Sequence, residues 1–487
     1  MKIIKKIMCL LVLFCLFGCS SDIKVGESIE PKENETKTYI YDFPNEIDFY
    51  ELRSSLFEER KEIYNDKNEF DECSTYYDQI IESSATINQD DLYMALETSD
   101  DYEKVLSLDE AVKEVEFLFR ILRYGYGAYY YFGGDEQFEL IKNKIIASLE
   151  DNMSTESYLK VLKESFAECV RDGHFSIGKG PEGRVLNINA HPYYYYSDMY
   201  FDIDEENKFY LLSQGVKWYY VSCCDKARIV PTLLEDGRLV YNLMIYSSEI
   251  PDYKLILTDG KSERIESNIN WTRAAMSSTG FEDKKELTDD YYMVNILGPN
   301  TDRNLSNLDP FINSKNILFD NRGNGGRSLN NIPRLMEDFF PSVIGESYSY
   351  KIYNVERENA LFRDLPIGGE RVIQVRNDGK LIENDNKNIF ILVNKDNGSN
   401  GEDFEYIFKS YSNTVVIGVN TGGSEICGNV KQFYLPYSKI PVTFGISLKF
   451  YETVSNLDGI GIEPDIWCDP GISLTATENL IKRLNSN

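Results

Sequence analysis

Histidine is almost absent from this chain of 487 residues, which contains two, His174 and His191. A catalytic histidine, if there is one, is therefore one of these two. Nine cysteines are present but no C-x-x-C pair, which argues against a metal site built from cysteines. Positive charge is also scarce, with 51 Lys and Arg against 80 Asp and Glu and a formal net charge of −29. This balance argues against a nucleic-acid partner.

Long apolar runs are missing after the first residues. The chain opens with Lys2, Lys5 and Lys6, continues with the apolar run CLLVLFCLF and closes with LFGCSS. This is the layout of a signal peptide, and the run is shorter than the roughly 20 residues that span a membrane. LFGC resembles the bacterial lipobox, which implies cleavage before Cys19 and lipid attachment to it. We expect an exported protein anchored at the cell membrane through Cys19, with a plain secretory signal as the alternative.

The residue patterns divide the rest of the chain into segments. After the leader at 1–18, residues 19–45 are polar and predict a flexible tether. Residues 46–181 predict a helical domain, and 182–300 a small β domain that caps a cleft or resembles a PDZ domain. Apolar runs alternate with helical patterns over 301–480, which predicts an α/β core with a parallel sheet.

Local signals support these segments. Ser107 and Glu110 have the spacing of a capping box at the start of a helix. Two more amphipathic helices are predicted at 136–151 and 155–170. Within the core, the pattern predicts strands and helices separated by a β-rich insertion: strands 316–320, 388–394 and 414–419, helices 329–340 and 401–411, and the insertion 341–387.

Ser399 lies in the segment ILVNKDNGSNGEDF, where a predicted strand turns into a helix. Ligands bind at the carboxyl ends of parallel strands, and a helix N-terminus there presents free N–H groups to a developing anion. Such a serine is well placed to be a nucleophile. Serine is also a favoured turn and N-cap residue, so position alone leaves both interpretations open.

A glycine-rich loop follows another predicted strand in ILFDNRGNGGRS, which contains Gly325 and Gly326. Glycines let the backbone approach a ligand closely, so the loop could bind phosphate or an oxyanion. It lacks the G-K-[ST] ending of a P-loop and the G-x-G-x-x-G spacing of a dinucleotide site. A flexible turn is the alternative.

Five motifs in order resemble one family. DGHFSIG, ILFDNRGNGG, NGSNGED, VNTGG and DGIGIEPD are similar to the motifs of the tail-specific (C-terminal processing) and tricorn-core serine peptidases. The resemblance covers about residues 165–475. It implies a ClpP/crotonase-like parallel-sheet core and a serine peptidase that needs no metal or cofactor.

Matched residue by residue, the resemblance implies specific roles. Ser399 matches the nucleophile and His174 the general base of the tricorn-like branch. Glu402 matches a supporting residue at the start of the following helix. The N–H groups that stabilise the oxyanion would come from Gly325 or Gly326 and from Asn400.

Some positions depart from the family pattern. Ser424 stands where the processing-protease branch has its catalytic lysine, and Lys431 is out of register. Asp458 stands where the tricorn-like branch has a glutamate that orients the histidine, and Glu463 is the neighbouring alternative. Gly173 replaces a polar residue before the histidine.

The resemblance therefore implies a lipid-anchored endopeptidase with a triad of Ser399, His174 and Asp458, acting on proteins or peptides through an acyl-enzyme. The alternative is a catalytically inactive lipoprotein that binds peptides on the same fold.

Overall fold

The structure of this chain is a computed structural model that describes most residues from Ile40 onward. The described residues are 40–64, 75–76, 78–80, 90, 94, 105–186, 193–275, 285–288, 290–295, 313–326, 349–353, 373–376, 387–409, 411–450 and 456–486. The predicted leader, Cys19, nearly all of the tether, His191 and the predicted helix 329–340 lie outside them. In the described part of the chain, no helix has the length and apolar character needed to cross a membrane.

Parallel strands form the centre of the predicted core. They follow the order β13, β14, β17, β18 and β21, and each pairs in parallel with its neighbour. Their bounds are Tyr292–Asn295, Asn316–Asp320, Asn388–Val393, Thr414–Gly418 and Ile466–Trp467. Every residue of β14, β17 and β18 is buried, which explains why the centres of these strands appear in the sequence as short apolar runs.

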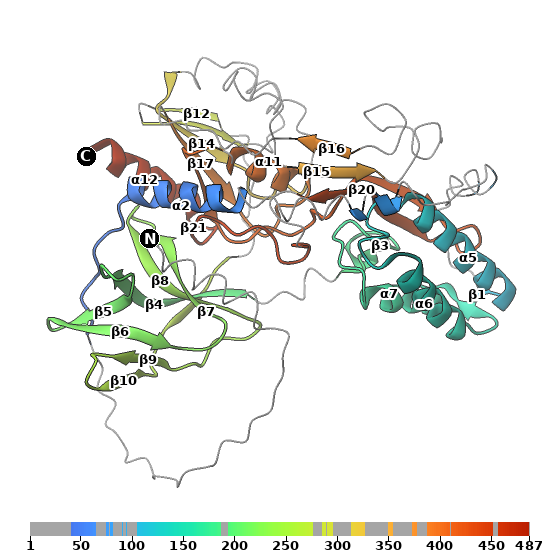
Figure 1. The fold of residues 1–487 in the computed structure, drawn as a ribbon, viewed down its shortest axis with the longest axis horizontal. Helices are drawn as coiled ribbons and strands as arrows, with labels where there is room; N and C mark the ends of the chain where they lie inside the picture. The colour runs from blue at the N-terminus through green and yellow to red at the C-terminus, as the bar shows by residue number, and fades with distance from the viewer. Residues whose placement is uncertain are drawn as a thin grey trace, which may run out of the picture. The chain divides into compact units, whose positions relative to one another are not determined.

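Helices cover both faces of these strands because successive side chains of a strand point to opposite faces. Leu318 of β14 shares a hydrophobic cluster with α2 (Phe49–Tyr64) and α12 (Ser473–Ser486). The next residue, Phe319, contacts Phe404 and Phe408 of α11 (Asn400–Lys409), with ring centroids 5.3 and 5.1 Å apart. Figure 1 shows α2 and α12 side by side next to the parallel strands. The structure thus packs α2 on the core sheet, although its residues fall within the helical segment predicted from the sequence.

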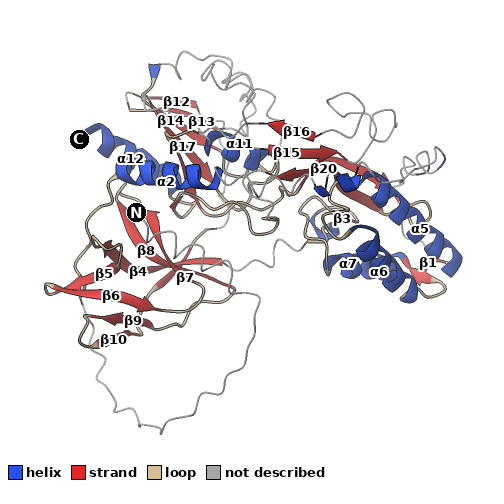
Figure 2. Ribbon diagram, viewed as in Figure 1, coloured by secondary structure: helices blue, strands red, loops and turns tan. Residues whose placement is uncertain are grey.

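The other helices form a separate layer. They are α5 (Leu108–Gly125), α6 (Gly134–Ala147) and α7 (Thr155–Ala167). Ser107 caps α5, and the reciprocal bond from Glu110 completes the predicted capping box. The apolar faces of these helices share one core with β19 (Cys427–Tyr434) and β20 (Pro441–Phe450). Figure 2 shows the three helices grouped beside β3 (Ser176–Ile177), which pairs with β20.

The predicted β region is a set of antiparallel strands. Their bounds are β4 Tyr193–Ile203, β5 Phe209–Ser213, β6 Val216–Ser222, β7 Ala227–Leu233, β8 Leu239–Ser247, β9 Leu255–Thr258, β10 Glu263–Glu266, β11 Trp271–Arg273 and β12 Lys285–Leu287. The strand β7 pairs with β21 of the core, and β12 pairs with β13. Hydrogen bonding is therefore continuous between the two regions, and residues from 285 onward belong to the core sheet although they were predicted within 182–300.

The remaining elements are short. They are β1 Val105–Leu106, β2 Met153–Ser154, the 3-10 turn Pro181–Gly183, β15 Ser349–Tyr353 and β16 Ile373–Arg376. The last two strands pair with each other, and β15 pairs with β20, which agrees with the β character predicted for the insertion.

Candidate active site

Ser399 lies at the turn between β17 and α11, as its motif predicts. Its φ of 54° falls in the left-handed region, where residues other than glycine are uncommon. The next residue, Asn400, begins α11, so the serine stands at the positive end of the helix dipole. The side chain is half-buried. A strained serine at a helix N-terminus, where a parallel strand ends, is placed to react with a ligand at that edge.

The glycine loop after β14 lies directly against this turn. A Cβ atom on Gly326 would lie 2.7 Å from the Cβ and 3.2 Å from the Oγ of Ser399. One on Gly401 would lie 1.9 Å from the carbonyl oxygen of Asn324. Gly326 also has a φ of +104°. Only glycine fits these contacts, so the loop backbone can approach whatever is bound at Ser399.

The candidate oxyanion donors differ in how firmly they are already bonded. The N–H of Gly325 donates to the carbonyl of Gly323 at 2.9 Å. The N–H of Gly326 donates to the side-chain oxygen of Asn324 at 3.3 Å, which is a long bond. Among the described residues, no bond is made by the N–H of Asn400. Gly326 and Asn400 are therefore the donors most readily available to a ligand.

Glu402 joins the serine turn to the loop that follows β18. Its fully buried carboxylate accepts from the N–H groups of Ser399, Gly423 and Ser424 at 3.1, 2.8 and 3.0 Å, and from the hydroxyl of Thr421. Burial raises the pKa of Glu402, and the hydrogen bonds from Thr421, Ser424 and Gly423 oppose the rise. The residue predicted to have a supporting role thus holds the backbone of the serine turn in place.

His174 lies between α7 and β3, and its backbone N–H donates to Asp172 at 2.7 Å. Its Nδ1 atom is buried without a hydrogen-bond partner among the described residues. Burial, together with the charges of Lys449 and Arg184, lowers the pKa of this imidazole to about 4. The ring is therefore neutral at neutral pH, which is the form a general base needs.

Asp458 contacts the backbone of the histidine loop. Its Oδ2 accepts from the N–H of Gly173 at 2.7 Å, and its Oδ1 from the N–H groups of Glu425 and Ile426 at 2.6 and 2.8 Å. In the described residues it makes no hydrogen bond to the imidazole of His174. The orienting contact that the resemblance implies for Asp458 is thus replaced here by contacts with three backbone amides. The alternative, Glu463, pairs with Arg228 of β7 instead.

Ser424 connects the surroundings of the serine and of the histidine. A Cβ atom on Gly173, just before the histidine, would lie 2.3 Å from the Ser424 hydroxyl. One on Gly398, just before the serine, would lie 3.7 Å from the same hydroxyl. The chain segments that carry Ser399 and His174 therefore meet at Ser424. The two side chains form no hydrogen bond with each other in the described residues, and catalytic bonds often tighten only when substrate is present.

A buried ionic cluster beside His174 was not predicted. Lys449 of β20 lies 3.0 Å from Asp403 of α11 and 3.4 Å from Glu425. The three residues are distant in the sequence and the motifs imply no role for them, so no local signal predicts that they meet. Their position depends on the packing of β20 against α11 and the loop that follows β18.

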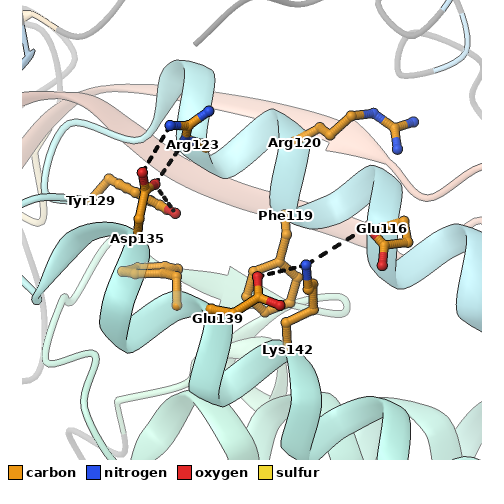
Figure 3. Close-up of a pocket in the computed structure, with 9 residues that line it drawn as sticks. Glu116, Phe119, Arg120, Arg123, Tyr129, Asp135, Glu139 and Lys142 are labelled. Carbon is orange, nitrogen blue, oxygen red and sulfur yellow. Dashed lines mark hydrogen bonds and ion pairs between the residues drawn. The ribbon is translucent and has the colours of Figure 1, made fainter. Parts of the chain in front are cut away.

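A separate cleft of about 380 Å³ lies between α5 and α6. Figure 3 shows two sets of ion pairs in its lining: Arg123 with Asp135, and Lys142 with Glu139 and Glu116. None of the predicted site residues lines it.

The model of Peptidase family S41 matches residues 298–468, the stretch that carries Gly326, Ser399, Glu402 and Asp458. This part of the chain is similar to peptidase family S41. The resemblance in the motifs is thereby confirmed over this stretch, and the match supports a serine peptidase that acts on proteins or peptides. His174 lies outside the matched stretch and reaches the matched core through the pairing of β3 with β20.

Solved structures of similar fold include three examples. A candidate peptidase from Parabacteroides merdae is 14% identical, with a TM-score of 0.42 over 77% of this chain and 97% of its own. The photosystem II D1 C-terminal processing protease is 12% identical, with a TM-score of 0.36 over 79% and 98%. A lipoprotein from Streptococcus agalactiae is 13% identical, with a TM-score of 0.36 over 79% and 100%. A search of curated proteins finds no match.

Proposed function

We propose that this chain is a lipid-anchored serine endopeptidase in which Ser399 is the nucleophile and His174 the general base. The observation that carries the proposal is the construction of the serine turn. Ser399 has a strained φ, its backbone is held by the buried Glu402, and Gly326 lies against its side chain. Strained backbone that the surroundings hold in place is concentrated at functional sites.

In the proposed reaction, the Oγ of Ser399 attacks the carbonyl carbon of the scissile peptide. His174 accepts the hydroxyl proton at Nε2 and then donates it to the leaving amine. The N–H groups of Gly326 and Asn400 stabilise the tetrahedral oxyanion, and each such donor is typically worth about 10²–10³ in rate. Water then hydrolyses the acyl-enzyme by the same steps and restores both residues.

Asp458 has a positioning role in this proposal. Its carboxylate binds the N–H of Gly173 and the N–H of Glu425, so it holds the histidine loop against the loop that follows β18. The depth of His174 in the site thus depends on Asp458 through the backbone.

The membrane anchor is proposed from the sequence of the leader. Its positive start, short apolar run and LFGC ending support export and lipid attachment at Cys19. Mass spectrometry of the mature N-terminus tests this: a lipid-modified cysteine at residue 19 supports the anchor, and an unmodified N-terminus refutes it.

Labelling with a fluorophosphonate tests the catalytic proposal. We expect the mature chain to label, Ser399→Ala to lose labelling, and His174→Ala to label at least ten times more slowly. Ser222→Ala, on the exposed strand β6, is the matched control and should label normally. A folded wild type that does not label, or labelling that survives in Ser399→Ala, would refute the proposal and favour the peptide-binding alternative.

A further inference from the structure

Lys395 lies in the turn after β17, four residues before Ser399. Its ammonium group donates to two backbone carbonyls, that of Thr421 at 3.0 Å and that of Ile460 at 3.1 Å. The side chain is half-buried, and within the described residues no acid lies close enough to form an ion pair with it. A cation that loses hydration without gaining a counter-ion costs folding free energy, so its place in the fold requires an explanation.

Thr421 connects this lysine to the serine turn. The hydroxyl of Thr421 donates to the carboxylate of Glu402, which in turn accepts the N–H of Ser399 at 3.1 Å. The carbonyl of the same threonine accepts from the ammonium of Lys395. The lysine therefore holds the loop that follows β18 against the turn that carries the proposed nucleophile.

Ile460 connects the same ammonium to the histidine loop. It lies in the loop before β21, two residues after Asp458. The carboxylate of Asp458 accepts the N–H of Gly173, directly before His174, at 2.7 Å. Lys395 and the histidine loop are thus bonded to the same short stretch of backbone.

The loops that Lys395 joins also approach each other very closely. The N–H of Gly459 donates to the carbonyl of Gly423 at 2.9 Å. A Cβ atom on Gly423 would lie 2.5 Å from the nitrogen of Gly459, and one on Gly461 would lie 2.0 Å from the carbonyl oxygen of Thr421. Backbone carbonyls therefore converge at the place where Lys395 supplies a charged donor, and hydrogen bonds from a charged donor are the stronger kind.

We propose that Lys395 is a positioning residue for the proposed reaction, and that its ammonium fixes the loops of Ser399 and His174 relative to each other. This inference rests on the proposed function of those two residues. The lysine acts through backbone carbonyls and does not take the proton of the serine. Its loss should weaken the alignment of Ser399 with His174 while leaving both residues in the chain.

The charge on this ammonium depends on pH in an accessible range. Burial lowers the pKa of Lys395 to about 8, and the charge of Glu402 opposes that fall. The other acids near these bonds along the chain are Asp458 and Glu425, which are buried and bonded elsewhere, and Asp396, which is exposed. Above this pH the neutral amine still carries hydrogens, but its bonds to the two carbonyls lose the support of the charge.

Fluorophosphonate labelling of the mature chain across pH tests the proposal. Lys395→Met removes the ammonium, and Lys395→Arg keeps a charge that does not titrate. In the wild type we expect the labelling rate to fall above about pH 8. Lys395→Met should label about 10- to 10²-fold more slowly at pH 7 and lack this fall. Lys395→Arg should recover part of the rate and keep it to higher pH.

Lys387→Met is the matched control. The ammonium of Lys387 donates to the carbonyl of Ser314 at 2.7 Å, next to the end of β17 that lies away from the serine turn. Its loss removes a comparable bond from the same strand, so Lys387→Met should keep the wild-type labelling rate and pH profile. A lysine with only a structural role would likewise leave both quantities unchanged in the folded protein.

Hydrogen exchange measured by mass spectrometry separates this inference from the proposed function. In Lys395→Met, the loops at 419–426 and 456–462 should exchange about tenfold faster, as expected when hydrogen bonds from a charged group are lost. Unchanged exchange there, or an unchanged labelling rate and pH profile, overturns the role of Lys395 even if Ser399 labels. A wild type that does not label, together with faster exchange in Lys395→Met, refutes the catalytic proposal and supports the connection between the loops.

Discussion

Gly326→Ala offers the sharpest test of the serine site. The new methyl group would lie 2.7 Å from the Cβ of Ser399, a distance that real Cβ contacts essentially never show. One of the two must move, and a displacement of about 1 Å at a reacting group can cost about 10²-fold in rate. The substitution also places alanine at a φ of +104°, which costs about 1–2 kcal/mol.

The two effects can be separated with matched controls. Gly260 has a φ of +84° with nothing within 4 Å of an added Cβ, so Gly260→Ala measures backbone strain alone. Gly325→Ala adds a methyl next to the site at an ordinary 3.6 Å contact. We expect Gly260→Ala to lose about 1–2 kcal/mol of unfolding free energy and Gly326→Ala at least as much, while only Gly326→Ala slows labelling by about 10²-fold or more.

Fluorophosphonate labelling rates and urea unfolding curves measure the two quantities. If Gly326→Ala labels at the wild-type rate with only the stability loss of Gly260→Ala, Gly326 does not face the reacting atoms. The assignment of Ser399 as a nucleophile next to an oxyanion loop would then be wrong.

Three further predictions concern buried charge. Because the pKa of His174 is lowered to about 4, the labelling rate should fall on acidification only as the pH approaches about 4. A fall in the labelling rate centred near pH 6.5 would contradict a buried neutral base. Burial raises the pKa of Glu405, so this carboxyl stays protonated in the folded state while it ionises in the unfolded chain. The free energy of unfolding therefore falls as pH rises above about 4.5, by up to about 1.4 kcal/mol per pH unit. Glu405→Gln should therefore melt at higher temperature at pH 7 and like the wild type near pH 4; equal melting at both pH values would refute this. Lys449→Met leaves the partly buried Asp403 and the buried Glu425 without their cation. It should cost about 3–5 kcal/mol at neutral pH and less at acidic pH, where the carboxyls protonate, as denaturant unfolding would show.

Much of the core could be predicted from local patterns, because burial on both faces leaves a direct trace in the sequence. The strands β14, β17 and β18 are buried throughout, have apolar centres and appear within one residue of the predicted ranges. The capping box at Ser107 is likewise a local interaction between residues three apart. The family motifs marked the serine turn and the glycine loop, and the structure brings Gly326 against Ser399.

The sequence by itself determined the type of core, the position of the serine turn and which two histidines could act as a base. The first two depend on neighbouring residues, and the third follows because the chain contains so few histidines. Tertiary structure alone decided the partners of the buried charges. Glu402 collects donors from residues 19 to 22 positions away, Asp458 reaches back to Gly173, and Lys449 joins Asp403 to Glu425. Such contacts follow from how loops converge at one edge of the sheet, and no spacing along the chain encodes them.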